Sequence, residues 1–373
     1  MTTENPTAAA VVHPRSVVGT LPRYTAGKPP IVVEGLQSFK LSSNENPLGP
    51  VPAVLDAVRS LADINRYPDS LSTKLRTALG KFLDVAAEDI VTGAGSLGAL
   101  NQLLSAFAGQ NEDGRPDEVI YAWRSFEAYP ICVGLAGAQS IMVPLKADGT
   151  HDLDAMAATV TDRTRVILLC TPNNPTGPVL FTEEVERFIG SVPADVVIVI
   201  DEAYMEFVRA EDAVDGIAMY RKYPNVVVLR TFSKAHGLAG LRVGYSVSRP
   251  ELTRYLRVTA TPFAVSSLAE HAAVVSLQNY GQVVERVQSL VDERNRVTAG
   301  LRALGWDIPD AQGNFVWLNL GENSTGFAAL AEQRGLSVRA FGDEGVRVSI
   351  GETEANTRFL ELCAEYTKAP QRS

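Results

Sequence analysis

Four short segments rich in Val, Ile and Leu constrain the fold of this 373-residue chain more than any other feature. They lie at residues 117–121, 165–169, 196–200 and 226–229. None of them alternates apolar with polar residues, which is the pattern of a strand buried on both faces rather than on one. The segments between them are long enough for crossover helices. The sequence therefore predicts an α/β fold with a mostly parallel sheet covered by helices.

The pattern of the chain changes after about residue 265. Residues 265–304 have the composition of one long helix. Short apolar runs and a further helical segment follow, at 314–318, 324–334, 336–339 and 346–349. This mixture of strands and helices predicts a smaller α+β domain at the C-terminal end.

A chain of 373 residues is long enough for two hydrophobic cores. We assign residues 42–265 to a large α/β domain. We assign residues 1–41 and 266–373 to an N-terminal arm and a small C-terminal α+β domain, and we expect the arm to pack near that small domain.

The composition excludes several classes of function. The formal net charge is −9 and no run of Lys or Arg occurs, so we expect no nucleic acid partner. No apolar run approaches the roughly 18 residues of a membrane span, so we expect no membrane partner. The three cysteines and four histidines are scattered, without C-x-x-C or H-E-x-x-H spacing, which argues against disulfides and a bound metal. Because no signal-peptide pattern begins the chain, these features predict a cytoplasmic protein.

Polar residues follow three of the predicted strands. They form the segments 171–177, 201–204 and 231–234, and the last continues to a glycine-rich stretch at 240–244. In open α/β sheets, ligands bind at the carboxyl ends of the strands. Each segment alone has an ordinary structural explanation, such as a turn or a helix cap.

The order of these segments resembles that of the fold-type I aminotransferases, which depend on pyridoxal 5'-phosphate (PLP). The family pattern is N-P-x-G, then D-x-x-Y, then S-x-S-K or T-x-S-K, then an arginine eight residues later. This chain meets it with Asn174, Asp201, Tyr204, Lys234 and Arg242. The resemblance covers nearly the whole chain and implies the fold-type I architecture, a large sheet domain with a smaller α+β domain.

The resemblance implies a role for each of these residues. Lys234 supplies the primary amine that binds the cofactor and then moves protons. Asp201 keeps the pyridine nitrogen protonated, so that the ring can withdraw electrons. Asn174 and Tyr204 donate hydrogen bonds to the ring oxygen. Thr231 and Ser233 of the T-x-S-K segment, with the later Arg242, hold the cofactor phosphate.

A glycine-rich segment at 92–98 follows the short apolar pair Ile90-Val91. A helix is expected to start near Leu97, and amides at a helix N-terminus bind anions. The resemblance implies that the phosphate contacts come from Ala94, Gly95 and Ser96.

The same segment leaves one alternative open. Gly93, Gly95 and Gly98 match G-x-G-x-x-G, and Asp113 and Asp117 lie about 20 residues later, as in dinucleotide-binding oxidoreductases. The motif alone is weak, and it does not explain the lysine, aspartate and asparagine of the strand ends.

Two aromatic residues complete the cofactor site that the resemblance implies. Phe126, in the segment 123–129, matches the aromatic residue that stacks on the pyridine ring. Tyr67 matches a tyrosine that reaches the cofactor phosphate of the neighbouring subunit. The resemblance therefore implies a homodimer with shared active sites.

The substrates that the resemblance implies are an amino acid and a 2-oxo acid. Arg347 matches the family's arginine for the α-carboxylate, which a guanidinium binds with two hydrogen bonds. The segments 21–28 and 41–50 resemble the histidinol-phosphate aminotransferase branch, which also contains aromatic amino acid aminotransferases.

Residues 123–127 and 231–236 look more like the phenylalanine-specific members of that branch. We therefore expect transfer between phenylalanine or tyrosine and 2-oxoglutarate. Tyr24 and Arg339 match positions that bind a substrate phosphate, so histidinol phosphate stays an alternative donor. A lyase or racemase would use the same cofactor residues.

Overall fold

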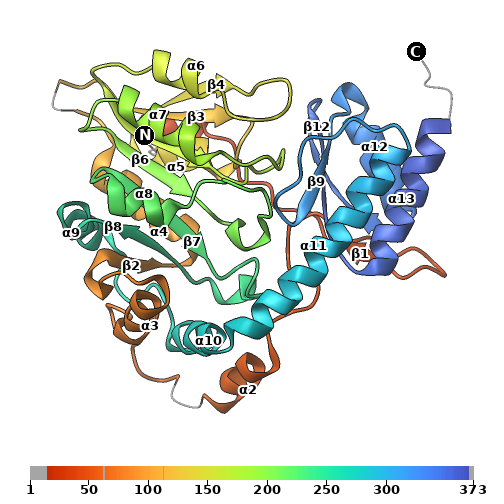
Figure 1. Cartoon of the computed structure of the whole chain (residues 1–373), viewed down its shortest axis with the longest axis horizontal. Helices are drawn as coiled ribbons and strands as arrows, with labels where there is room; N and C mark the ends of the chain where they lie inside the picture. Colours follow the sequence, from red (N-terminus) through yellow and green to blue (C-terminus); the bar gives the residue numbers. More distant parts are fainter. Residues whose placement is uncertain (1–14, 62–63, 112, 369–373) are drawn as a thin grey trace, which may run out of the picture.

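Seven strands form the central sheet of the structure, a computed structural model that describes residues 15–61, 64–111 and 113–368 (Figure 1). Their order across the sheet is β2-β8-β7-β6-β5-β3-β4. All share one direction except β8, which runs antiparallel to β2 and β7. The bounds are β2 Ile90–Gly93, β3 Glu118–Trp123, β4 Gln139–Pro144, β5 Thr164–Cys170, β6 Val197–Asp201, β7 Val226–Thr231 and β8 Gly244–Ser248. The predicted α/β fold with a mostly parallel sheet is confirmed.

The central strands are those with continuous apolar runs. Every residue of β6 and β7 is buried, and so is every residue of β5 except Arg165. Successive side chains point to opposite faces, so Ile198 and Ile200 contact one core cluster while Val197 and Val199 contact the other. Strands β4 and β8 were not predicted, because β4 is a largely exposed edge strand and β8 begins with a glycine between polar segments.

Helices cover both faces of the sheet. One face packs against α4, α5 and α9, and the other against α6, α7 and α8. The helices of the described residues are α1 Ser16–Thr20, α2 Pro52–Ser60, α3 Thr73–Leu83, α4 Gly95–Phe107, α5 Ala128–Ala136, α6 Leu153–Ala158, α7 Thr182–Ser191, α8 Gly216–Lys222, α9 Pro250–Thr259, α10 Ser267–Gln278, α11 Tyr280–Ala303, α12 Ser324–Gln333 and α13 Thr353–Lys368. None of them is both long and apolar enough to cross a membrane.

The predicted single helix over residues 265–304 is wrong in one respect, because two helices occupy this segment. Asn279 separates α10 from α11, with φ −111° and ψ 29° instead of helical angles. Its side-chain amide donates to the carbonyl of Val275 at 2.9 Å, which caps the end of α10. Helix α10 packs against α2 and α3, whereas α11 packs against α13 (Figure 1).

A second, smaller sheet follows α11. Its order is β11-β12-β9, all antiparallel, with bounds Arg339–Phe341, Gly345–Ser349 and Phe315–Leu318. The predicted strand at 336–339 is divided between β11 and the two-residue β10, Leu336–Ser337. Strand β10 pairs in parallel with β1, Phe39–Lys40, so the end of the N-terminal arm lies beside this part of the chain. Residues 1–14 of the arm lie outside the described residues.

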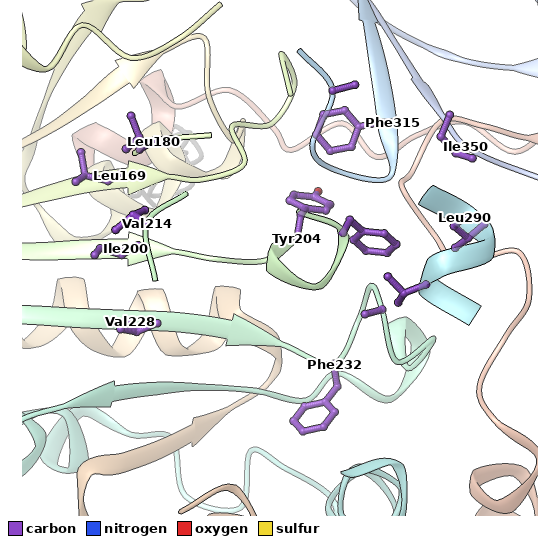
Figure 2. Close-up of a cluster of buried hydrophobic side chains, with 14 of the residues drawn as sticks. Leu169, Leu180, Ile200, Tyr204, Val214, Val228, Phe232, Leu290, Phe315 and Ile350 are labelled. Atoms are coloured by element: carbon purple, nitrogen blue, oxygen red, sulfur yellow. The ribbon is translucent and has the colours of Figure 1, made fainter. Parts of the chain in front are cut away.

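One hydrophobic cluster extends from the large sheet to the small one. Figure 2 shows Tyr204 and Phe315 between strand residues such as Ile200 and the side chain of Ile350. The ring centroids of Tyr204 and Phe315 are 5.1 Å apart. The division of the chain into two domains at about residue 265 stays a prediction.

Candidate active site

The polar segments after β5, β6 and β7 meet at one edge of the large sheet. The strand register pairs Cys170 with Asp201, and Asp201 in turn with Leu229. The pocket at this edge has a volume of about 310 Å³, at the lower end of the range of small-molecule sites. Most of the residues expected from the sequence line it: Tyr24, Ser96, Phe126, Asn174, Asp201, Tyr204, Thr231, Ser233, Lys234, Arg242, Arg339 and Arg347.

Three expected residues lie outside the lining of this pocket. Ala94 and Gly95 lie behind it, against Arg242. Tyr67 is 83% exposed and stacks on Phe263 with ring centroids 4.7 Å apart. A surface tyrosine of this kind is free to contact another molecule.

A chain of hydrogen bonds joins the groups expected to hold the phosphate. The Thr231 hydroxyl donates to the Ser233 hydroxyl at 3.0 Å, and Arg242 Nη1 donates to the same Ser233 oxygen at 3.3 Å. Gly95 begins α4 with a φ of +76°, and a Cβ on it would lie 2.5 Å from Arg242 Nη2. Glycine is therefore required here by both backbone angle and space.

The first turn of α4 offers unsatisfied amides beside these groups. Ala94 occupies the N-cap position and makes no side-chain cap hydrogen bond. The first amides of a helix lack intrahelical partners and carry the positive end of its dipole. Together with Arg242 they form a cradle for an anion.

Asp201 ends β6 inside the pocket, with 6% of its surface exposed. Its Oδ2 accepts a hydrogen bond from the Tyr129 hydroxyl at 2.7 Å, while Oδ1 has no partner among the described residues. Burial raises the pKa of this carboxyl to about 6, although the Tyr129 hydrogen bond opposes the shift. A buried, unpartnered carboxylate oxygen requires a hydrogen-bond donor. A ligand bound in the pocket can supply that donor.

Tyr129 is a site residue that the sequence did not assign. It lies three positions after Phe126, on the first turn of α5, and is almost completely buried. Its ring packs edge-on against Phe126, with centroids 5.6 Å apart. Tyr129 therefore contacts both Phe126 and Asp201, two residues expected in the pocket. In the sequence it has the pattern of an ordinary core residue.

Lys234 lies on the pocket wall, with its Nζ 3.3 Å from the carbonyl oxygen of Ser43. Burial, together with the positive charge of Arg347, lowers the pKa of this amine to about 7. A lysine with such a pKa is partly neutral near pH 7 and can act as a nucleophile or a base.

Two more groups are fixed around the lysine. The Tyr204 hydroxyl accepts a hydrogen bond from Asn44 at 3.1 Å, and its ring centroid lies 5.6 Å from the Lys234 nitrogen. Asn174 accepts from Arg347 Nη1 at 2.5 Å through its amide oxygen. The amide nitrogen of Asn174 is thus the group that can donate into the pocket.

Arg347 is held by neutral acceptors. Besides Asn174, its Nη2 donates to the carbonyl of Ser42 at 2.9 Å. The side chain is 8% exposed, and its Nε has no partner among the described residues. A buried guanidinium that binds only neutral groups is suited to a carboxylate ligand.

These residues fit PLP as the sequence implies it. The unpartnered Asp201 oxygen suits a protonated pyridine nitrogen, and the Lys234 amine suits the aldehyde carbon. The uncapped start of α4, with Arg242, suits the phosphate. We detect no group of His, Cys, Asp and Glu that could hold a metal ion in the part of the chain that the structure describes.

Residues 37–362 match the family model described as aminotransferase class I and II. The chain belongs to this family. PLP is the cofactor of these aminotransferases. The family excludes the dinucleotide-binding oxidoreductase alternative, and the structure agrees. Strand β2, which precedes G-x-G-x-x-G, is an edge strand that pairs with the antiparallel β8. In a dinucleotide-binding domain, the corresponding strand begins a parallel βαβ unit.

Two relatives place this aminotransferase more closely. A protein named aromatic amino acid aminotransferase from Streptomyces avermitilis is 51% identical over 355 residues, which cover 95% of this chain and 97% of that protein. One of the same name from Thermobifida fusca is 50% identical over 355 residues, covering 95% and 97%.

Solved structures agree on the fold. The histidinol-phosphate aminotransferase of Sinorhizobium meliloti, solved with PLP, superposes with a TM-score of 0.84 at 25% identity, covering 96% of this chain and 99% of that one. A putative histidinol-phosphate aminotransferase from Erwinia carotovora gives 0.82 at 25% identity, covering 93% and 99%.

The pKa of Lys234 leads to a pH prediction for the cofactor-free protein. Only the neutral amine attacks a carbonyl carbon, so the rate of PLP capture should fall about tenfold per pH unit below about pH 7. Above about pH 8 the rate should level off, whereas an amine with the usual pKa of 10.5 would react faster up to pH 10. Absorbance after rapid mixing measures this rate.

A variant provides the control for that profile. Arg347→Gln removes the neighbouring charge that lowers the lysine pKa most, so its profile should shift to higher pH. A rate that rises without a plateau to pH 10 in the unaltered protein would contradict the low pKa of Lys234.

Proposed function

We propose that the protein transfers the amino group between an aromatic amino acid, phenylalanine or tyrosine, and 2-oxoglutarate. The observation that carries the proposal is the position of Arg347, a buried guanidinium bound to neutral acceptors beside the aromatic side chain of Phe341. It offers one anion site next to an apolar wall, as an aromatic amino acid needs. The names of the relatives at about 50% identity support the same substrate class.

Each pocket residue then has a chemical task. Bound PLP supplies an electron sink that makes the α-proton of an amino acid acidic. Lys234 holds the cofactor and carries that proton, for which a pKa of about 7 is well matched. Arg347 binds the α-carboxylate and so orients the α-carbon. Asp201 keeps the electron sink charged, with Tyr129 fixing the direction of its carboxylate.

Histidinol phosphate is the second candidate donor. Tyr24 and Arg339 line the pocket as this alternative requires, and the solved structures with that name share the fold. However, Arg339 already binds a carboxylate, that of Glu127 at 2.7 Å. A substrate phosphate would have to compete with this ion pair, which favours the aromatic substrate.

A panel of donors tests the proposal. The purified protein, loaded with PLP, is incubated with 2-oxoglutarate and with phenylalanine, tyrosine or histidinol phosphate, and glutamate formation is measured. We expect glutamate from phenylalanine and tyrosine at rates above that from histidinol phosphate. Glutamate formation from neither aromatic donor would refute the proposal.

We also propose that the active protein is a homodimer in which Tyr67 contacts the cofactor phosphate of the other subunit. Tyr67 lies outside the lining of its own pocket and stacks on Phe263, which is 44% exposed. Ile64, three residues earlier in the sequence, is 79% exposed. An apolar patch of this kind is typical of an interface. Dilution should therefore reduce specific activity as the dimer dissociates, and full activity of a demonstrated monomer would contradict the shared site.

A reducing, cytoplasmic location fits the same account. Cys132, Cys170 and Cys363 are all unbonded and buried, as expected for cysteines that serve as small apolar side chains.

A further inference from the structure

Glu127 and Arg339 line one end of the pocket, here called its far end, and begin a chain of alternating charges. The chain continues beyond the pocket lining to Arg124 and Glu344. Arg339 Nη2 lies 2.7 Å from Glu127 Oε2, and Glu127 Oε1 lies 3.9 Å from Arg124 Nη1. Arg124 is in turn bonded to Glu344, through Nε at 2.7 Å. Two guanidiniums thus meet two carboxylates, and this cluster has no net charge.

Arg347 differs from the arginines of this cluster. The three guanidiniums of Arg124, Arg339 and Arg347 all lie 5.4–5.5 Å from the ring centroid of Phe341. Arg347 is bound to neutral acceptors alone, as described above, while the other two are each paired with a carboxylate, that of Glu127 or Glu344. Among the described residues around this ring, one positive charge is therefore left for a ligand.

We propose that Glu127 determines which substrates fit the far end of the pocket. Its carboxylate occupies Arg339 in place of a second anionic group, so a substrate with one carboxylate and a neutral aromatic side chain meets a charge-balanced surface. A substrate with a second anion, such as 2-oxoglutarate, must displace Glu127 from Arg339. This proposal rests on the proposed function, because it assigns the aromatic and the dianionic substrate to the same pocket.

The geometry allows such a displacement. Glu127 is the residue before α5, its side chain is 30% exposed, and it lines the pocket together with Arg339. Arg339 is more firmly held, with 11% exposure and a second hydrogen bond from Nη1 to the carbonyl of Ala26 at 3.1 Å. The carboxylate can turn toward solvent while the guanidinium stays in place to bind an incoming anion.

Binding of two dead-end ligands to the PLP-loaded protein tests the proposal. Glutarate carries two carboxylates, whereas 3-phenylpropanoate carries one carboxylate and a phenyl ring. In Glu127→Gln, the competing charge is gone while the size of the side chain is kept. We expect the ratio of the Kd of 3-phenylpropanoate to that of glutarate, measured by calorimetry, to rise about three- to tenfold, since a partly exposed ion pair is being removed.

Two further variants make the result specific. Glu344→Gln removes an equal charge from the same cluster, but from Arg124 instead of Arg339, and should change the ratio by less than about twofold. In the double variant Glu127→Gln with Arg339→Gln, the increase should disappear, because the released guanidinium is absent.

Each outcome decides the question. If Glu127 only positions Arg339 for binding, the ratio of the Kd of 3-phenylpropanoate to that of glutarate falls in Glu127→Gln. Either a lower ratio or an unchanged ratio overturns the proposal. Equal increases in Glu127→Gln and Glu344→Gln would reduce the effect to general electrostatics and also refute it. The unaltered protein's turnover of phenylalanine is measured separately, so failure of the proposed function is distinguishable from failure of the role of Glu127.

Discussion

Lys234→Ala is expected to lower kcat at least about 10³-fold, since one side chain both holds the cofactor and moves the α-proton, and proton transfer alone contributes about 10²–10⁴-fold. The structure supports this expectation because the Lys234 amine lies in the pocket with a pKa lowered to about 7. Turnover of phenylalanine with saturating PLP and 2-oxoglutarate measures the effect.

Lys40 provides the matched control for this experiment. Its positive charge reaches Lys234, but its own amine is paired with Glu45 at 2.9 Å on the protein surface. Lys40→Ala should therefore retain turnover within a few-fold. Borohydride reduction of the unaltered protein, followed by peptide mapping, should place the cofactor on the peptide that carries Lys234. A label on another lysine would contradict the assignment.

Asp201→Asn is expected to leave PLP bound but to lower kcat by about 10²–10³-fold, the size found when one preorganised electrostatic partner is removed. The amide keeps the shape of the side chain but cannot stabilise a positive charge on the pyridine nitrogen. Turnover and the absorbance of bound cofactor, measured on the same sample, separate loss of chemistry from loss of binding. Near-normal turnover with full cofactor content would rule out this role for Asp201.

Tyr129 gives a graded version of the same test. Tyr129→Phe removes the 2.7 Å hydrogen bond to Asp201 and leaves the ring that packs on Phe126. Hydrogen bonds to charged groups contribute about 1.5–3 kcal/mol, so kcat should fall about tenfold or more. Tyr121→Phe changes a buried neighbour whose ring lies 5.6 Å from that of Tyr129, and serves as the control. Equal effects of the two variants would reduce Tyr129 to a packing role.

Much of the fold could be predicted because burial on both faces leaves a simple trace in the sequence. The apolar runs of β5, β6 and β7 identified the centre of the sheet, and the polar residues after them identified the edge at which the pocket lies. The break at Asn279 could not be predicted, since the neighbouring residues continue a helical pattern. Helix α10, which ends at this break, packs against α2 and α3, and these contacts are distant in sequence.

The side-chain partners within the site show the same limit. Tyr129 contacts Asp201 across 72 positions of sequence, and Arg339 contacts Glu127 across 212. No local pattern marks either pair, because each forms only when separate elements come together. The family resemblance suggested Arg339 as a phosphate ligand, and only the structure shows that a carboxylate of the protein already binds it.

The relative kcat/KM for phenylalanine and histidinol phosphate, measured with 2-oxoglutarate as acceptor, tests the central claim most directly. At the far end of the pocket Arg339 is already paired with Glu127, so a neutral ring fits there while a phosphate must break an ion pair. We therefore expect the ratio to favour phenylalanine by about tenfold or more. A ratio that favours histidinol phosphate would contradict the proposed substrate and would make Arg339 a phosphate ligand.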